Sequence, residues 1–74
     1  MITADKLTLL TNMPSAMLEQ ALPLKGRPKL HSARFLGITN GHEFCYSVMD
    51  TDGGEGKVFL KYDPTVDRVS ATMS

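Results

Sequence analysis

The residues that could bind a transition metal or act as a nucleophile are few in this sequence: His31, His42 and the single cysteine, Cys45. Zinc needs histidine and cysteine side chains that converge on one point, and a catalytic cysteine needs a histidine within hydrogen-bonding reach. His42 and Cys45 are three positions apart in a predicted strand, so their side chains point to opposite faces. The spacing therefore predicts neither a zinc site nor a Cys–His pair. We expect Cys45 to be an ordinary, half-buried small side chain.

The stretch DTDGGEG, which starts at Asp50, combines acidic residues and glycines in the manner of a calcium-binding loop. An EF-hand loop needs an acidic residue at its fifth position, glycine at its sixth and glutamate at its twelfth. Counted from Asp50, these positions hold Gly54, Glu55 and Lys61, so the pattern fails. The same stretch lacks the lysine and the strand-to-helix context of a phosphate-binding loop. We expect a flexible acidic hairpin loop without a cofactor, and no catalytic site.

A basic run in the segment LPLKGRPKL is the clearest polar signal, with Lys25, Arg27 and Lys29 in the segment and Arg34 shortly after it. Such a run attracts either phosphates or an acidic protein surface. Eight basic residues balance eight acidic ones, so the chain lacks the net positive charge of a dedicated nucleic-acid binder. We therefore treat a nucleic-acid-binding module that uses Lys25 to Arg34 as the alternative interpretation. In the preferred one, Arg27 and Lys29 steer an acidic protein partner.

Helical spacing of apolar residues indicates a helical segment over residues 3–22. The stripe consists of Leu7, Leu10, Met13, Met17, Leu18, Ala21 and Leu22. Thr3 is a suitable N-cap, and Asp5 suits the positive end of the helix dipole. Pro14 disfavours helical geometry in the residue before it, so we predict a break near Asn12 and Met13. The result is one kinked helix or two short ones, followed by an extended connector over residues 23–29.

Alternation and turn signals over residues 30–73 predict an antiparallel sheet. We expect strands over Leu30–Thr39, His42–Asp50, Lys57–Asp63 and, in short form, Val69–Met73. Asn40-Gly41 between two apolar runs is the strongest short-range hairpin signal. Helices followed by a meander indicate the α+β class. We predict a single small domain of residues 1–74, in which the N-terminal helical segment packs on a three- to four-stranded antiparallel β-meander.

A two-residue loop at Asn40-Gly41 sets a register for the first two strands. It pairs Phe35 with Tyr46, Leu36 with Cys45, Gly37 with Phe44, Ile38 with Glu43 and Thr39 with His42. One face then carries Ala33, Phe35, Phe44, Tyr46, Val48, Val58, Leu60 and Tyr62, and we expect the helices to cover it. The opposite face carries Leu36, Ile38, Cys45, Met49 and Phe59, mixed with Arg34, Glu43, Ser47 and Lys61.

One layer of helices cannot cover both faces of a sheet. The apolar residues of the second face are either isolated surface side chains, which are common, or a surface that another protein covers. Burial of a leucine, isoleucine or phenylalanine side chain would contribute about 1.5–3 kcal/mol. Both interpretations stay open, and we take the second as the working hypothesis. We expect a non-enzymatic protein-binding module that uses this face or an open strand edge. The predicted partner-binding residues are Leu36, Ile38, Met49 and Phe59, together with Arg27 and Lys29.

The partner in this hypothesis is another protein or a second copy of the chain, as in a homodimer. The small size and the lack of a catalytic motif fit an accessory or inhibitor protein of a phage or another mobile element. The N-terminal stretch lacks the pattern of a signal peptide, and no apolar run approaches the length of a membrane span. We therefore expect a soluble cytoplasmic protein that has no contact with a membrane.

Overall fold

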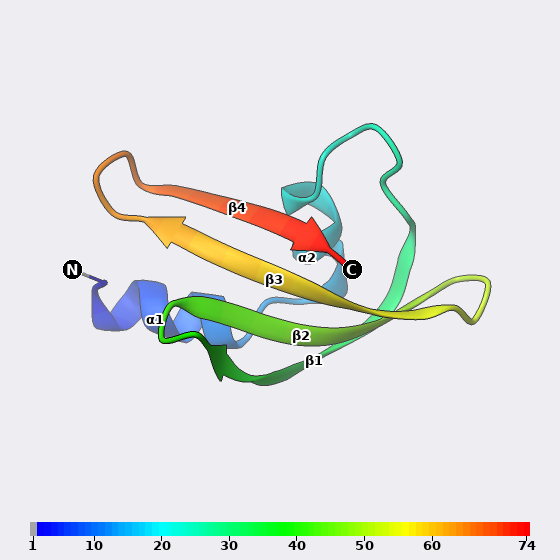
Figure 1. The fold of residues 1–74 in the computed structure, drawn as a ribbon, viewed down its shortest axis with the longest axis horizontal. Helices are drawn as coiled ribbons and strands as arrows, with labels where there is room; N and C mark the ends of the chain where they lie inside the picture. Colours follow the sequence, from blue (N-terminus) through cyan, green and yellow to red (C-terminus); the bar gives the residue numbers. More distant parts are fainter. Residues whose placement is uncertain (1) are drawn as a thin grey trace.

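The computed structural model describes residues 2–74 and has two N-terminal helices packed on a four-stranded sheet (Figure 1). The helices are α1 (Ala4–Thr11) and α2 (Ser15–Ala21), and the strands are β1 (Leu30–Thr39), β2 (Glu43–Asp50), β3 (Glu55–Asp63) and β4 (Arg68–Met73). The strands lie side by side in chain order, and each is antiparallel to its neighbour. The predicted α+β arrangement is confirmed, with two short helices and a fourth strand.

Polar side chains mark both ends of α1. The side-chain oxygen of Thr3 accepts a hydrogen bond from the N–H of Lys6 at 3.2 Å, as expected of an N-cap. At the other end, the side-chain amide of Asn12 donates to the carbonyl of Thr8 at 2.8 Å. The hydroxyl of Thr11 donates to the carbonyl of Leu7 at 3.0 Å. The bond from Asn12 satisfies the carbonyl of Thr8, one of the last four carbonyls of α1, which lack a regular partner within the helix.

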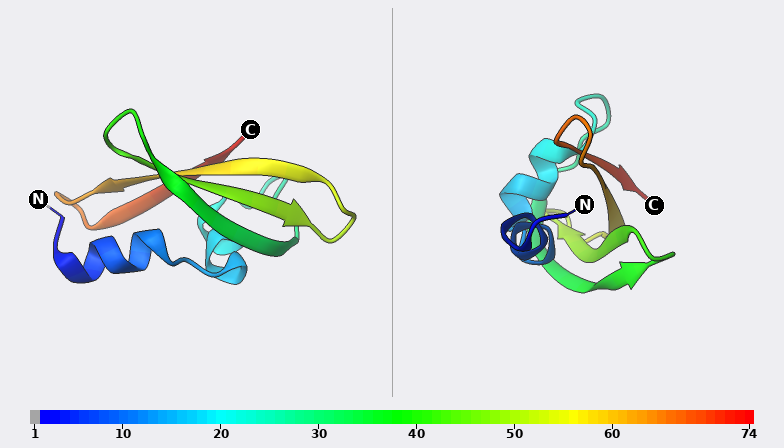
Figure 2. Two further views of the ribbon diagram at one scale, coloured as in Figure 1. Left: turned by 90° about the horizontal axis from the view of Figure 1, so that it is seen from below. Right: turned by 90° about the vertical axis from the view of Figure 1, so that its left-hand side faces the viewer.

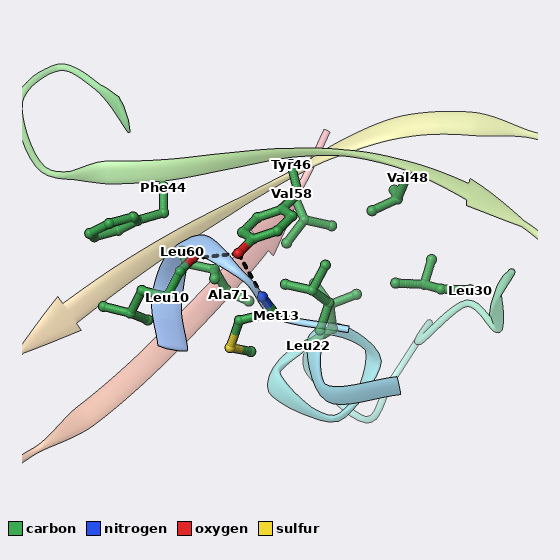
Figure 3. Close-up of a cluster of buried hydrophobic side chains, with 11 residues drawn as sticks. Leu10, Met13, Leu22, Leu30, Phe44, Tyr46, Val48, Val58, Leu60 and Ala71 are labelled. Carbon is green, nitrogen blue, oxygen red and sulfur yellow. Dashed lines mark hydrogen bonds between the residues drawn. The ribbon is translucent and has the colours of Figure 1, made fainter. Parts of the chain in front are cut away.

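A tyrosine from the sheet bridges the break between α1 and α2. In a continuous helix the carbonyl of Leu10 would accept from the N–H of residue 14, but Pro14 has no N–H. Tyr46 in β2, which is 1% exposed, donates its hydroxyl to that carbonyl and accepts from the N–H of Met13 at 2.9 Å (Figure 3). Burial raises the pKa of the Tyr46 hydroxyl more than the bond from Met13 lowers it. The hydroxyl therefore stays protonated, and able to donate, at neutral pH.

The core lies between the two helices and one face of the sheet (Figure 2). It comprises Leu10, Met13, Leu18, Leu22, Leu30, Phe44, Tyr46, Val48, Val58, Leu60 and Ala71, with Ala21, Ala33, Phe35, Tyr62 and Val69 packed against it. All the residues that were predicted for the helix-covered face are in this set, so that prediction is confirmed. The single helical stripe is not: Leu7 and Met17 are 43% and 40% exposed. The non-helical backbone at residues 12–14 interrupts the helical periodicity, so positions on α1 and α2 no longer share one stripe.

The register of the β1–β2 hairpin differs from the predicted one near its tip. The connecting loop contains Asn40, Gly41 and His42, and Thr39 pairs with Glu43 rather than with His42. Asn40 and Gly41 have φ angles of 52° and 75°, as their residue types allow, and the N–H of His42 donates to the carbonyl of Thr39 at 3.2 Å. The turn was thus placed correctly, but its loop is one residue longer than predicted.

A bulge at Leu36 compensates for the longer loop, so Phe35 still pairs with Tyr46 as predicted. Between the loop and the bulge, Gly37 pairs with Cys45 and Ile38 with Phe44, which makes the predicted pairings wrong there. Paired residues point to the same side of a sheet, so Ile38 is on the side of Phe44 and not on the opposite face. The hairpin tip bends away from the helices (Figure 2), and Ile38 remains 49% exposed.

The connector comprises residues 22–29, one more than predicted, because α2 ends at Ala21. Charged side chains hold it against the elements beside it. The guanidinium of Arg27 donates to the carbonyl of Leu22 at 2.6 Å and to that of Gln20 at 3.0 Å. These carbonyls lie at the C-terminal end of α2, where a positive charge is favourable. The carboxylate of Glu19 in α2 accepts from the N–H of Leu30 at 3.1 Å, at the start of β1. The connector is therefore held in place from α2 to the sheet.

Candidate functional site

The histidines and the cysteine that were considered for metal or nucleophile chemistry lie apart. His42 is exposed in the hairpin loop, not in the strand where it was predicted, and its ring Nδ1 lies 2.6 Å from the carbonyl of Asn40. His31 is exposed in β1, whereas Cys45 is 4% exposed in the central strand β2. Within residues 2–74, no three histidine, cysteine or acidic side chains are grouped so that they could hold a metal ion.

The acidic loop between β2 and β3 is stabilised by hydrogen bonds to the carboxylate of Asp50. One carboxylate oxygen of Asp50 accepts from the N–H of Asp52 at 2.9 Å and from the N–H of Gly54 at 2.8 Å. A Cβ atom at Gly54 would lie 2.6 Å from the other oxygen of Asp50, so only glycine fits here without displacing that carboxylate. This is an aspartate-stabilised turn, a role that aspartate and glycine commonly have without any metal.

The sheet face turned away from α1 and α2, which we call the outer face, carries one apolar row across the strands. Cys45 lies between Gly37 on β1 and Phe59 on β3, and Phe59 pairs in turn with Thr72 on β4. Leu36, the extra residue of the bulge, lies beside Gly37 and is 45% exposed. Because it sits in the middle of this row on a central strand, Cys45 is more deeply buried than the half-buried state predicted for it.

Polar rows border the apolar row on both sides. On one side Ser47 lies between Arg34 and Lys57, and on the other Glu43 pairs with Lys61. Met49 lies beyond the first polar row, between Ser32 and Glu55. The predicted apolar patch is therefore a single row plus a separate methionine.

The structure brings together only part of the predicted partner-binding set. Leu36 and Phe59 share the apolar row, where Leu36 is exposed and Phe59 is half-buried. Met49 is half-buried and separate, and Ile38 points to the helix side of the sheet. The grouping of these four residues rested on the two-residue loop, and the bulge at Leu36 removes Ile38 from it.

The basic residues of the connector line a different surface. A hollow of about 320 Å³ lies between the connector and the C-terminal end of β4. Its lining includes Leu22, Pro23, Lys25, Arg27, Thr72 and Met73. Sequence reasoning did not point to Thr72 and Met73, because no local pattern shows that the end of the chain lies beside the connector. Thr72 also ends the apolar row, so the row and the hollow meet at β4.

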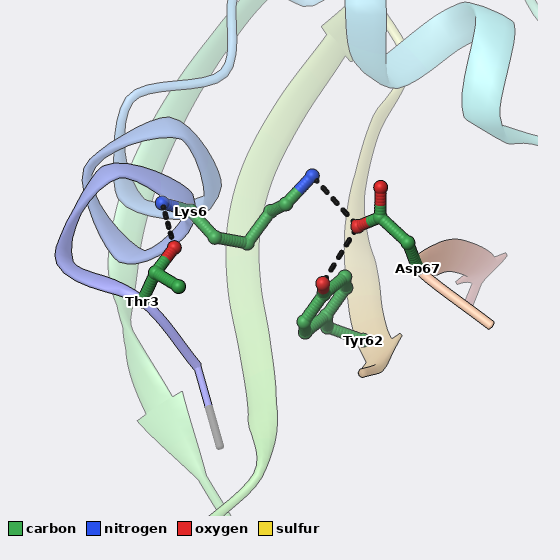
Figure 4. Close-up of polar contacts among 4 residues, drawn as sticks. All are labelled: Thr3, Lys6, Tyr62 and Asp67. Carbon is green, nitrogen blue, oxygen red and sulfur yellow. Dashed lines mark hydrogen bonds and ion pairs between the residues drawn. The ribbon is translucent and has the colours of Figure 1, made fainter. Parts of the chain in front are cut away.

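Lys6, Tyr62 and Asp67 form a polar cluster that joins α1 to the turn between β3 and β4 (Figure 4). The ammonium group of Lys6 lies 3.1 Å from a carboxylate oxygen of Asp67 and 5.2 Å from the centre of the Tyr62 ring. The Tyr62 hydroxyl donates to the same oxygen at 2.6 Å. This bond and the nearby ammonium lower the pKa of Asp67, while the bond raises the pKa of Tyr62. The cluster is an exposed set of polar contacts that links α1 to the turn between β3 and β4.

The lowered pKa of Asp67 predicts an acid-dependent loss of stability. A carboxyl group whose pKa is lower in the folded state stabilises the fold above its unfolded pKa, about 4, and this stabilisation disappears as pH falls through the folded pKa. We expect the melting temperature to fall more steeply between about pH 5 and pH 2 in the wild type than in Asp67→Asn. Asparagine keeps an oxygen that can accept from Tyr62 and removes only the charge. Thermal unfolding followed by circular dichroism at several pH values would measure this, and parallel curves for the two proteins would contradict it.

Comparisons with protein-family models, with curated proteins and with solved structures found no match to this chain. Its function is therefore inferred from its own surfaces. Within residues 2–74, neither helix has the length and apolar character that crossing a lipid bilayer requires. The candidate surfaces are the apolar row of the outer face, the two edge strands and the hollow beside β4.

Proposed function

We propose that the chain is a small non-enzymatic protein-binding module that acts as an accessory or inhibitor protein. The observation that carries this proposal is that α1 and α2 both pack on one face of the sheet, while no element of residues 2–74 covers the outer face (Figure 2). On that face Leu36 is 45% exposed, beside Cys45 and the half-buried Phe59. A protein that covered this row would gain about 25 cal/mol for each Å² of apolar surface removed from water.

The edges of the sheet offer a second means of contact within the same proposal. In the part of the chain that the structure describes, β1 and β4 are the two edge strands, each with a single neighbouring strand. An edge strand presents backbone N–H and C=O groups that an extended segment of another protein can pair with. Proteins of phages and other mobile elements that act by blocking a host protein are one class that this small module fits.

A protein partner is favoured over a nucleic acid by the state of the basic connector. The guanidinium of Arg27 is engaged with the carbonyls of Gln20 and Leu22, so the connector has fewer unbound cations for the several phosphate contacts on which nucleic-acid affinity depends. The balanced total charge also favours a protein. Affinity for nucleic acid that falls steeply as salt rises would instead support the alternative, a nucleic-acid-binding module using Lys25 to Arg34.

We expect the substitution Phe59→Asp to abolish association with the partner while the fold remains intact, because it places a charge in the apolar row. The matched control is Thr8→Asp, which introduces the same charge at an exposed position on α1. Self-association is measured by size-exclusion chromatography with light scattering. Association with another protein is measured by affinity capture from the native host, with the wild type, Phe59→Asp and Thr8→Asp each used as bait.

The decisive result is a binding partner, or a dimer, that the wild type and Thr8→Asp retain and Phe59→Asp loses. Circular dichroism of each variant separates lost binding from lost folding. Association of Phe59→Asp equal to that of the wild type would count against the outer face as the binding surface.

A further inference from the structure

The two edges of the sheet are not equally protected. β1 is interrupted at two places where its register with β2 shifts, between Leu30 and Ser32 and between Phe35 and Gly37. Such bulges disturb the regular spacing of backbone groups and are a common means of protecting an edge. The pairing of β4 with β3 runs from Arg68 to Met73 without a shift. The edge of β4 is thus the regular one, and neither a proline nor an acidic residue interrupts this strand.

The hydrogen-bond pattern shows which backbone groups of β4 face outward. Ser74 and Lys57 exchange two hydrogen bonds, of 3.0 and 3.2 Å. Along an antiparallel ladder, residues whose backbone groups bond to the neighbouring strand alternate with residues whose backbone groups point away from it. Ser74 is of the first kind, so Met73, Ala71 and Val69 are of the second, and their N–H and C=O groups point away from β3. The turn and loop hydrogen bonds between backbone groups of residues 2–74 use none of these groups.

The hollow beside the connector lies at the end of this open edge, since Thr72 and Met73 form part of its lining. Its other walls combine the apolar side chains of Leu22 and Pro23 with the basic residues Lys25 and Arg27. Within residues 2–74 the one ion pair joins Lys6 to Asp67, so neither Lys25 nor Arg27 forms an ion pair with a carboxylate. The site therefore complements a ligand with a negative charge.

We propose that β4 and this hollow bind an extended, acidic segment of a partner protein. The main chain of the segment pairs with the outward groups of Val69, Ala71 and Met73, and one of its acidic side chains lies at the hollow, near Lys25. The inference rests on the proposed protein-binding function and names the edge and the chemistry of the partner. A second copy of this chain fits the site less well. Two β4 strands paired antiparallel would bring Arg68 of one copy toward the basic hollow of the other.

The probe for this proposal is a displayed library of random linear peptides, selected against the folded chain. We expect the selected peptides to carry an acidic residue among β-branched ones. Their affinity is then measured by fluorescence anisotropy with Lys25→Glu and with Lys61→Glu, the latter being the same charge reversal on the outer face. Lys25→Glu should bind about tenfold more weakly than the wild type, which corresponds to about 1.4 kcal/mol, whereas Lys61→Glu should not change the affinity.

A second pair of variants tests the backbone pairing. Met73→Pro removes an outward N–H group at an edge, where proline is tolerated, and Met73→Ala keeps that group while shortening the side chain to a similar extent. Met73→Pro should therefore bind the peptides more weakly than Met73→Ala. Thermal unfolding of both variants confirms that they fold.

Three results would overturn the inference: no selected peptide, binding that Lys25→Glu leaves unchanged, or equal binding by Met73→Pro and Met73→Ala. A dimer of the wild type that becomes a monomer in Met73→Pro would also overturn it, because the edge would then be occupied by a second copy. If any of these occurs while Phe59→Asp still abolishes partner association, the proposed function stands and only the β4 site is lost.

Discussion

Replacing Tyr46 by phenylalanine is expected to lower the free energy of unfolding by about 2–4 kcal/mol, although it removes a single oxygen atom. That oxygen serves two backbone groups at once, the carbonyl of Leu10 and the N–H of Met13. Neither group has a helical partner. Pro14 has no N–H for the carbonyl of Leu10. The carbonyl of Leu9, to which Met13 would donate in a continuous helix, accepts from Asn12 instead. Both would be left buried without a partner, which is more costly than the loss of an exposed hydrogen bond. A domain of 74 residues has a total stability of about 4–11 kcal/mol, so the loss is a large part of it.

Urea denaturation followed by circular dichroism measures this loss, with Tyr62→Phe as the matched control. Tyr62 also donates a hydroxyl hydrogen bond, but its acceptor Asp67 is exposed and can bond to water instead. We expect a much smaller shift of the urea midpoint for Tyr62→Phe than for Tyr46→Phe. Equal shifts for the two variants would show that the bridge at the helix break contributes nothing beyond an ordinary surface hydrogen bond.

The helical part of the fold could be predicted because its signals are local. The Thr3 cap, the break before Pro14 and the extended connector each follow from residues that are close in sequence. The bridge from Tyr46 could not be predicted in the same way. It joins residues 33 and 36 positions apart, and nothing near Tyr46 indicates that its hydroxyl will meet the broken end of α1.

The sheet shows the same division between local and distant information. Asn40-Gly41 predicts a reversal of the chain, because both residues tolerate positive φ, but it does not determine the number of residues in the loop. The added loop residue and the bulge at Leu36 cancel each other, so the core residues from Phe35 back to Ala33 lie on the predicted face. The predicted pairing is wrong only between the loop and the bulge, and this segment contains Ile38.

The candidate surfaces could be predicted only where they depend on residues that are close in sequence. Alternation along β2 and β3 is enough to place Phe59 and Cys45 on one face, so the apolar row follows from the sequence. The hollow does not, because it forms where the connector meets β4, two segments from opposite parts of the chain. Thr72 belongs to both features: it ends the apolar row and lines the hollow. A partner strand on β4 would therefore reach both surfaces that we propose for binding.

The second large expected effect concerns α2, whose C-terminal end holds Arg27 at the hollow, and it is expected in the variant Leu18→Ala. α2 has seven residues, too few for a helix to be stable on its own, so it depends on packing. Leu18 is 0% exposed and is the buried residue within this helix. Its truncation should lower the free energy of unfolding by about 2–5 kcal/mol, the range for a leucine that leaves a cavity in a core.

Met17→Ala is the matched control, because Met17 is the preceding residue of the same helix and is 40% exposed. Alanine is a good helix former in both variants, so a difference between them reports burial rather than helix propensity. We expect Met17→Ala to stay within about 0.5 kcal/mol of the wild type in urea denaturation. If both variants lost the same stability, α2 would not be held to the sheet through Leu18. The carbonyls at its end that position Arg27, and with it one wall of the hollow, would then depend on some other contact.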